Sequence, residues 1–260
     1  MALIVNADDF GKSQEVNKAI EESFSKGFIN RTTIMVNMPA AEEAYEIAYK
    51  NGFVNKVGIH LNLTEGYPIT ENIKKNRDFC DEDGKFNSAF YHSTKKRLYM
   101  NEQAVSVITE ELKAQLDKYK ELGFTLNHVD SHHHVHTNYP VFKALKRLSK
   151  EYEFSSVRLS RNLYKGGSKL NRLYKYLFNK SVKKICSSTT DYFGSFKDAV
   201  DYFATEFNEE LVDDASSKCV KFYSEKDLEI MVHPMYSKDG VLVDTDIPFE
   251  KEILLYETKK

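Results

Sequence analysis

Five of the chain's eight histidines lie within a stretch of nine residues, from His128 to His136. In an extended segment side chains alternate between the two faces of the strand, so His128, Asp130 and His132 would share one face. That face would carry two imidazoles and a carboxylate, which are ordinary ligands of divalent transition metals. Such a density of polar groups is costly to bury unless something coordinates it. The segment therefore favours a metal site over the alternative, a solvated polar loop.

Further ionisable side chains stand beside apolar, strand-like runs elsewhere in the chain. Asp8 and Asp9 follow the first run, His60 alternates with aliphatic residues in a third run, and His233 follows the last, just as the residues from His128 to His136 follow the fourth run. In a parallel α/β fold the carboxyl ends of the strands lie at one rim, so we expect these groups to meet there. Taken singly, the aspartates could cap a helix and each histidine could be a hydrogen-bonded core residue. Taken together, they favour a shared site.

Asp9, His60 and one histidine of the 128–136 cluster would form a three-ligand metal site with open coordination positions. That arrangement is typical of a catalytic centre, whereas structural zinc sites are closed. The second carboxylate, Asp8, would then be available as a general base for a water at the metal.

The segments that must position these groups alternate between strand-like and helix-like patterns. Continuous apolar runs and β-branched residues predict strands, while apolar stripes with caps and terminal glycines predict helices. Repeated alternation, with polar residues at several strand ends, favours an α/β fold with a barrel-like sheet. The predicted strands cover residues 2–7, 32–36, 57–63, 126–129, 156–159 and 228–232, and the predicted helices cover residues 13–26, 39–52, 101–123 and 139–150.

Two segments depart from this alternation. Between residues 64 and 101 the periodicity breaks, and we expect an insertion that lies over the C-terminal rim of the sheet and shapes a substrate cleft. Residues 165–184 are basic and amphipathic, which predicts an ordinary packed helix and leaves contact with a membrane surface or a partner as the alternative. The whole chain, 1–260, is expected to form one domain. The apolar face of the basic stretch consists of Leu170, Leu173, Tyr174, Leu177 and Phe178.

The composition excludes several classes of protein. Hydrophobic residues are 41% and charged residues 29% of the chain, which is enough apolar material for a large core. A net charge of −2 offers no basic field for nucleic acid. The apolar start is too short for a signal peptide or a membrane span, so we expect a cytoplasmic protein. The three cysteines lack the spacing of a metal site or a disulfide framework, which indicates incidental thiols.

Four motifs that contain the candidate residues occur in a fixed order along the chain. They are Asn6-Ala7-Asp8-Asp9-Phe10-Gly11, Gly58-Ile59-His60-Leu61-Asn62-Leu63-Thr64, His128-Val129-Asp130-Ser131-His132-His133-His134-Val135-His136 and Met231-Val232-His233-Pro234. In this order they closely resemble the YdjC-like carbohydrate deacetylase family, which includes chitooligosaccharide deacetylase. The resemblance covers residues 3–142 well and the region of His233 again, and it is weak between 161 and 226.

The resemblance implies a distorted (β/α) barrel, similar to a TIM barrel, and a hydrolase that removes an N-acetyl group from an amino sugar or oligosaccharide and releases acetate. It implies one divalent metal ion at the positions of Asp9, His60 and His132. Asp8 matches the position of the general base, and His233 matches the candidate acid or substrate-polarising group. An acetylated sugar would be the partner, within carbohydrate metabolism and polysaccharide degradation.

Other polar residues near these motifs are expected to support the site. Asp130 would orient a metal ligand or His233 by accepting an N–H bond. His128, His134 and Arg158 are candidates for a supporting role or for contact with the substrate. The chain departs from common family usage after Arg158 and at Met235, and both departures bear on the identity of the substrate.

The type of ligand favours Zn²⁺ or Mn²⁺ over Mg²⁺, because imidazole suits borderline metals and Mg²⁺ prefers oxygen. The resemblance nevertheless implies magnesium, so the identity of the ion stays open. Two other functions compete: a metal-dependent phosphoesterase, and a catalytically silent sugar-binding protein that contains a metal. The small number of carboxylates weighs against the first, and the presence of both Asp8 and His233 weighs against the second. A homodimer is expected from base rates alone.

Overall fold

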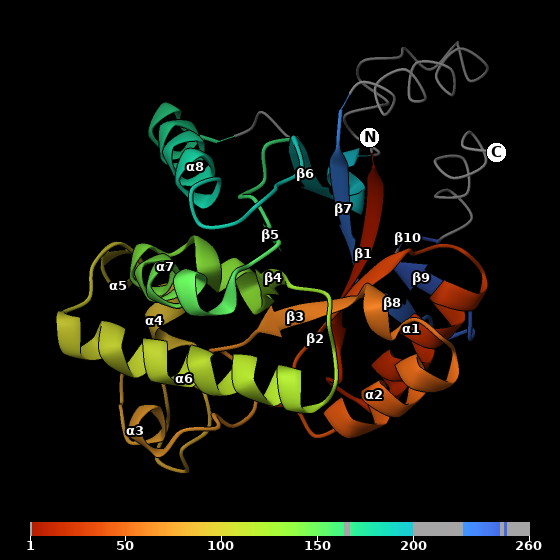
Figure 1. Ribbon diagram of the computed structural model, residues 1–260, viewed down its shortest axis with the longest axis horizontal. Coiled ribbons are helices and arrows are strands. Elements are labelled where there is room, and N and C mark those ends of the chain that lie inside the picture. The colour runs from red at the N-terminus through yellow and green to blue at the C-terminus, as the bar shows by residue number, and fades with distance from the viewer. Residues whose placement is uncertain (1, 164–166, 200–225, 245–246, 249–260) are drawn as a thin grey trace.

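The computed structural model describes residues 2–163, 167–199, 226–244 and 247–248, and within these ranges strands and helices alternate along the chain (Figure 1). The strands are β1 (Leu3–Phe10), β2 (Arg31–Ile34), β3 (Val57–Leu61), β4 (His128–Ser131), β5 (Ser156–Val157), β6 (Tyr192–Ser195), β7 (Leu228–Val232), β8 (Pro234–Tyr236), β9 (Leu242–Asp244) and β10 (Ile247–Pro248). The helices are α1 (Gln14–Ser25), α2 (Ala41–Lys50), α3 (Glu71–Lys74), α4 (Ala89–His92), α5 (Thr94–Leu98), α6 (Glu102–Glu121), α7 (Tyr139–Tyr152) and α8 (Lys169–Val182), with the 3-10 helices η1 (Val54–Lys56) and η2 (His132–Thr137).

Strands β1 to β7 form one sheet in the order β5-β4-β3-β2-β1-β7-β6. Every neighbouring pair in this sheet is parallel. The sheet curls into a half-barrel (Figure 1), and a bridge between Ser156 and Ser188 brings its β5 edge against the segment that leads into β6. Because the strands all run the same way, their carboxyl ends share one rim. The predicted α/β fold is confirmed, and the curled sheet agrees with a distorted barrel.

Local sequence signals set the ends of the helices that cover the sheet. The Ser13 side chain accepts a hydrogen bond from the backbone N–H of Val16 and begins α1. The Asn101 side chain does the same with Ala104 at the start of α6. Such caps satisfy backbone donors that a helix leaves free at its first turn. Both helices therefore begin where the sequence predicts.

Strand β4 begins two residues later than predicted, and this changes the place of His128. The register of β4 against β3 pairs Asp130 with His60, so His128 stands at the start of the strand. Gly58 makes room for it, since a Cβ there would lie 2.9 Å from the backbone oxygen of His128. The prediction that His128 follows the strand, at the rim, is wrong because pairing with β3 sets where β4 starts.

Residues 64–101 contain the short helices α3, α4 and α5. Phe79, Phe86 and Phe90 are buried and belong to the same hydrophobic core as the strands of the sheet. Helix α3 packs against α6, and α5 packs against α7. At the start of the segment, Thr64 and Glu65 contact η2, which begins at the rim. That the segment is an insertion that shapes a substrate cleft stays a prediction.

Helix α8 packs through a narrower face than predicted. Phe178 is buried and Tyr174 is half-buried, as expected for an inward face. Leu170, Leu173 and Leu177 are exposed by 78%, 53% and 53%. The prediction that all five side chains pack inward is wrong, because at about 100° per residue the three leucines form a stripe well to one side of Phe178.

Other sequence predictions concern single features of the chain. Cys80 and Cys186 are free thiols, while Cys219 lies outside the described residues. Among the helices within the described ranges, none is long and apolar enough to cross a membrane. The single domain spanning 1–260 stays a prediction.

Candidate metal centre and active site

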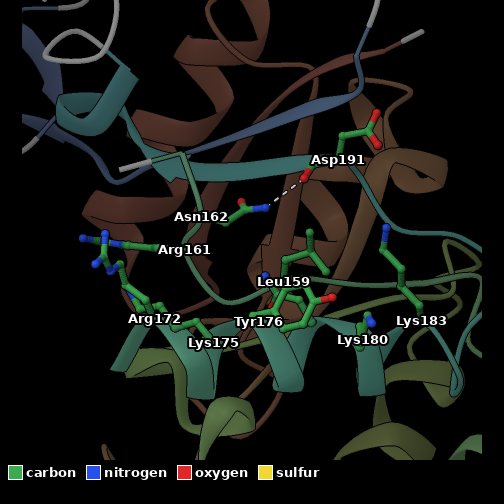
Figure 2. Close-up of a pocket in the computed structure, with 10 residues that line it drawn as sticks. Leu159, Arg161, Asn162, Arg172, Lys175, Tyr176, Lys180, Lys183 and Asp191 are labelled. Atoms are coloured by element: carbon green, nitrogen blue, oxygen red, sulfur yellow. Dashed lines mark hydrogen bonds between the residues drawn. The ribbon is translucent and has the colours of Figure 1, made fainter. Parts of the chain in front are cut away.

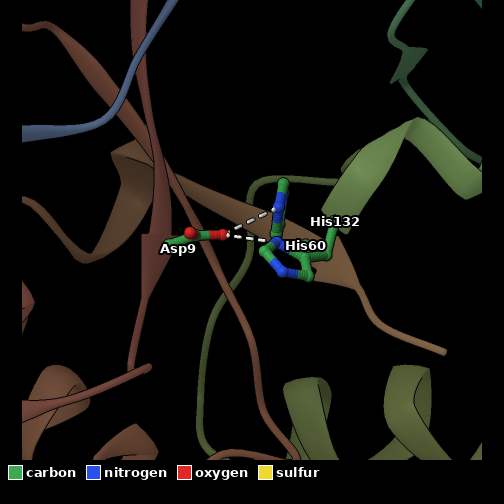
Figure 3. Close-up of side chains that lie close together, drawn as sticks. All are labelled: Asp9, His60 and His132. Carbon is green, nitrogen blue, oxygen red and sulfur yellow. Dashed lines mark hydrogen bonds and ion pairs between the residues drawn. The ribbon is translucent and has the colours of Figure 1, made fainter. Parts of the chain in front are cut away.

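Asp9, His60 and His132 meet at the carboxyl ends of β1, β3 and β4. Figure 3 shows both imidazoles turned towards the Asp9 carboxylate, whose Oδ1 lies 3.2 Å from Nε2 of His60 and 2.8 Å from Nδ1 of His132. The three ligand atoms lie within 4.8 Å of one another, and all three residues are buried. The structure thus brings together the three side chains that were predicted to bind the metal.

A bulge in β1 allows two consecutive aspartates, Asp8 and Asp9, both to lie close to His60. In a regular strand Asp8 and Asp9 would point to opposite faces of the sheet. The register of β1 against β2 shifts between Ala7 and Phe10, and Asp9 adopts a φ of +69°. Bulges re-aim side chains in this way, and aspartate tolerates the left-handed region better than most residues. The irregularity therefore turns Asp9 towards the two histidines.

The second ring nitrogen of each of these two imidazoles faces another carboxylate. Nδ1 of His60 lies 2.6 Å from Oδ1 of Asp130, and Nε2 of His132 lies 2.9 Å from Oε2 of Glu65. A metal-ligating histidine usually donates its other ring N–H to a carboxylate, which fixes its tautomer and its orientation. Asp130 therefore stands where the sequence predicted a supporting carboxylate. Glu65 holds the equivalent place beside His132.

The chemistry of this donor set fits a divalent cation. Two imidazole nitrogens and one carboxylate oxygen suit zinc, manganese and similar ions. Burial lowers the pKa of His60, but the charges of Asp130 and Asp8 outweigh burial and raise that pKa to about 10. Burial raises the pKa of Asp9, yet its bonds to His132 and His60 hold that pKa well below the usual value. The surroundings thus favour a positive charge between these groups, carried either by a proton or by a metal ion.

Asp8 is held by a buried guanidinium group. Nη1 of Arg158 lies 2.7 Å from Oδ2 of Asp8, Nη2 lies 2.7 Å from Oδ1, and the Asn6 side chain donates to Oδ1 at 2.8 Å. Burial raises the pKa of Asp8, but the charges of Arg158 and His60 together with the hydrogen bonds from Arg158 outweigh burial, so the pKa lies well below the usual value. An oxygen of Asp8 also lies within 4.8 Å of a His60 nitrogen. An ionised carboxylate thus stands beside the metal centre.

Arg158 connects Asp8 to a wider buried network. Its Nη1 lies 2.7 Å from Oδ2 of Asp130, and its Nε lies 2.7 Å from Oε1 of Glu229. Arg31 reaches the same Glu229 oxygen at 2.8 Å. Burial raises the pKa of Glu229, but Arg31 and Arg158 outweigh burial and lower that pKa to about 2. Because buried charges persist only when they are paired, this network holds Asp8 and Asp130 in fixed positions relative to each other.

His233 follows β7 at the same rim. The pairing of Val232 with Ala7 places His233 beside Asp8 in the register of β7 and β1. Its backbone N–H donates to Oδ1 of Asp244 in β9 at 2.8 Å, and its side chain is half-buried. After burial and the charge of Arg158, the charge of His233 is a smaller influence on the pKa of Asp8. The structure therefore places the predicted base and the predicted acid at the carboxyl ends of adjacent strands.

The residues after His132 form a tight turn in which His133 and His134 have φ values of +51° and +54°. The His133 ring packs on the His132 ring with centroids 4.0 Å apart, and its Nδ1 lies 3.0 Å from Oγ1 of Thr64. Nδ1 of His134 is buried and has no hydrogen-bond partner among the described residues. Burial, followed by the charge of Arg158, keeps the pKa of His134 well below the usual value. His134 is therefore a neutral imidazole with a free nitrogen.

His128 lies in the buried network rather than at the metal centre. Its Nδ1 lies 2.7 Å from Oγ of Ser156, and its Nε2 lies 3.9 Å from Oε1 of Glu229. Burial, followed by the charge of Arg31, holds its pKa well below the usual value. His128 therefore packs as a neutral side chain at the amino end of β4.

Four charged residues of this region were not predicted from the sequence: Lys12, Arg31, Glu65 and Glu229. Glu65 and Lys12 pair at 2.9 Å, and Lys12 also lies 3.5 Å from Oδ2 of Asp9. Glu229 stands in a strand whose other residues are apolar, and Arg31 begins a strand whose four residues are all buried. A charge within a buried strand is costly unless it is paired, so its presence there was an available signal. Glu65 and Lys12 lie in connecting segments and carry no comparable signal.

Replacement of Glu65 by glutamine is expected to weaken metal binding about 10-fold to 100-fold, because losses of this size follow removal of a partner that orients a metal ligand. Competition with a fluorescent chelator measures the change in affinity. Glu71→Gln is the matched control, since Glu71 is exposed and pairs with Lys74. An affinity within two-fold of wild type would show that Glu65 does not orient His132.

The metal-free protein is expected to lose stability as the pH falls below about 6.5, in part through His136. His136 is fully buried, and burial, followed by the charge of Arg158, lowers its pKa to about 3. Between pH 6.5 and 3 the unfolded chain binds a proton that the folded chain does not, so the free energy of unfolding falls, by roughly 3 kcal/mol at pH 4. Urea unfolding at several pH values measures this. His136→Gln should flatten the dependence, while the exposed control His92→Gln should not.

Comparisons with known proteins agree with the geometry of the site. The sequence pattern of the family described as YdjC-like protein matches residues 2–257. A carbohydrate deacetylase of Halalkalibacterium halodurans is 37% identical over 153 residues, which are 59% of this chain and 62% of that protein. A carbohydrate deacetylase of Brevibacillus brevis is 32% identical over 244 residues, which are 93% of this chain and 84% of that protein. The alignment with the first relative thus spans less than two thirds of its length.

The fold also resembles a solved structure. A crystal structure from Enterococcus faecalis, described as that of a candidate cellobiose-phosphate cleavage protein, superposes with a TM-score of 0.66. The match covers 98% of this chain and 92% of that one, at 23% sequence identity. At this identity the likeness supports the fold, including the curled sheet, and nothing about the reaction.

Proposed function

The chain belongs to the YdjC-like protein family, and we propose that it is a metal-dependent hydrolase that removes the N-acetyl group from an acetylated amino sugar or oligosaccharide. The observation that carries the proposal is the ionised, arginine-held carboxylate of Asp8 beside the Asp9, His60 and His132 centre. A metal ion that only stabilised the fold would not need a base at that position. The relatives named carbohydrate deacetylase support the class of substrate.

The proposed reaction depends on residues that already stand in place. A divalent cation held by Asp9, His60 and His132 would supply Lewis acidity, which makes a water more acidic and stabilises negative charge on the amide oxygen. Asp8 takes a proton from the attacking water while the water oxygen bonds to the carbonyl carbon. Arg158 keeps Asp8 ionised and oriented for this transfer.

The second half of the reaction needs a proton donor. His233, as an imidazolium, donates a proton to the amine nitrogen while the bond from carbon to nitrogen breaks. Acetate and a free amino sugar leave the site, and the proton held by Asp8 returns to solvent. Asp130 and Glu65 hold His60 and His132 in orientation throughout.

The experiment that tests the proposal measures bound metals in protein purified without added metal, and acetate release from N-acetylglucosamine oligomers. We expect one divalent ion per chain and acetate release that a chelator abolishes and added metal restores. His132→Ala should lose about 100-fold or more in metal affinity and activity, whereas the exposed control His92→Ala should lose neither. Full activity of His132→Ala would contradict the assignment. Release of phosphate from a generic ester, or metal-dependent sugar binding without turnover, would favour the phosphoesterase or the silent sugar-binding protein instead.

A further inference from the structure

Among the described residues, the contacts of helix α8 with the rest of the molecule lie along one side of the helix. Phe178 packs against Phe142 of α7, with ring centroids 5.2 Å apart. The Asn179 side chain exchanges two hydrogen bonds with the backbone of Ser160, and the Tyr174 hydroxyl donates to the Thr137 carbonyl at 2.6 Å. These contacts determine which sides of the helix stay exposed.

An apolar stripe runs along the exposed side of α8. Leu170, Leu173 and Leu177 lie three and four residues apart, so they form one row on the helix surface. Their exposed fractions of 78%, 53% and 53% are high for leucine, and Tyr139 of α7 is exposed by 53%. Clustered apolar side chains on a surface mark an interaction site, whereas single ones do not.

Cationic side chains line the surface on both sides of this stripe. On one side is a cavity of about 470 Å³ between α8 and the segment 159–162 (Figure 2). One carboxylate, Asp191, lines it together with the cations Arg161, Arg172, Lys175, Lys180 and Lys183. On the other side is a groove of about 700 Å³ between α7 and α8. The cations that line this groove are Lys143, Lys146, Arg147, Lys150 and Lys184.

Acidic residues are missing from this part of the sequence. Residues 154–190 contain nine lysines and arginines and no aspartate or glutamate, although the whole chain has a net charge of −2. Glu102 pairs with Lys143 and Arg147, but no described carboxylate forms an ion pair with Lys146, Lys150 or Lys184. The positive charge is therefore concentrated around the leucine stripe and largely uncompensated there.

We propose that the leucine stripe and its flanking cations dock on an anionic membrane surface. An exposed apolar row bordered by lysines is the pattern of a helix that lies in the plane of a lipid interface, with leucines in the acyl boundary and cations at the headgroups. Such docking needs no membrane-spanning helix.

The positive charges around the leucine stripe argue against a second copy of the chain and against a nucleic acid as the partner of this surface. A second copy of the chain in a two-fold contact would place one basic face against the same basic face. A nucleic acid backbone would meet the cations but leave the leucines in water. A bilayer with anionic headgroups satisfies both the cations and the apolar row.

The test is flotation of the full chain with vesicles of pure phosphatidylcholine and with vesicles that contain 30% phosphatidylglycerol. We expect binding to the anionic vesicles alone, and weaker binding as salt rises, because screening shortens the reach of the cations. Replacing Lys180 and Lys184 together by glutamine should weaken binding about thirty-fold. Replacing Leu170, Leu173 and Leu177 together by glutamine should weaken binding about a hundred-fold or more.

Tyr49→Ser provides the matched control, because Tyr49 is an exposed aromatic side chain on α2, away from α8. Circular dichroism and thermal unfolding establish that every variant is folded. Equal binding to both kinds of vesicle, no binding to either, or wild-type binding by the leucine variant would overturn the proposal. So would sedimentation that shows a dimer for wild type and a monomer for the leucine variant, since the stripe would then belong to a second copy.

Discussion

Replacement of Asp8 by asparagine will lower the rate of acetate release about a thousand-fold, within the range by which a positioned general base accelerates a reaction. Asparagine has nearly the same shape and keeps an oxygen that can accept from Arg158, but it cannot take a proton from water. The metal content should stay at one ion per chain, because Asp9, His60 and His132 are untouched. Steady-state kinetics and elemental analysis of the same preparation measure the two quantities.

The control for this variant is Asp239→Asn, a carboxylate exposed in the turn after β8. It should keep both activity and metal. An Asp8→Asn protein that retains more than a tenth of the wild-type rate would contradict the role of Asp8 as base. A variant that loses its metal together with its activity would show instead that Asp8 belongs to the metal site.

Replacement of Arg158 by methionine will lower the free energy of unfolding by about 3–5 kcal/mol, the usual loss when one partner of a buried ion pair is removed. Asp8, Asp130 and Glu229 would each lose a contact of 2.7 Å with the guanidinium group, in surroundings without solvent. A loss of this size is a large share of the stability of a typical protein. Urea unfolding of the metal-free protein measures it.

Arg158→Lys separates the role in catalysis from the role in stability. Lysine keeps the charge but cannot make the bidentate contact with Asp8, so Asp8 is held less firmly and its pKa should rise towards the usual value. We expect a folded enzyme with kcat reduced by about 10-fold to 100-fold and an acid limb of the pH–rate profile at higher pH. Arg161→Lys is the control, because Arg161 is partly exposed at the surface and forms a single long ion pair, 3.7 Å, with Asp198. An unchanged profile in Arg158→Lys would mean that Arg158 has only a structural role.

The sequence predicted most of the candidate metal centre because the evidence for it is local. Apolar runs predict strands, and parallel strands deliver the residues at their ends to one rim, so Asp9, His60 and His132 could be grouped across long stretches of chain. The same rule placed His128 at the rim, where it does not lie. Only the register against β3 decides where β4 starts, and register depends on contacts between strands.

The partners of the site residues could not be predicted in the same way. Glu65 reaches His132 from a connecting segment, and a loop side chain has no periodicity that reveals its direction. Arg158 was a candidate without a defined contact. Its bonds to Asp8, Asp130 and Glu229 depend on the curl of the sheet, which brings carboxylates from three strands around one buried guanidinium group.

The sequence by itself therefore predicted which side chains would meet at the rim and which class of fold presents them, because residue type and hydrophobic period are properties of the chain. The tertiary structure decided how those side chains are used. The bulge at Asp9 turns a second aspartate into the site, the buried network keeps Asp8 ionised, and the packing of α8 leaves its leucines exposed. Each of these depends on pairing and burial between distant segments, which local patterns do not encode.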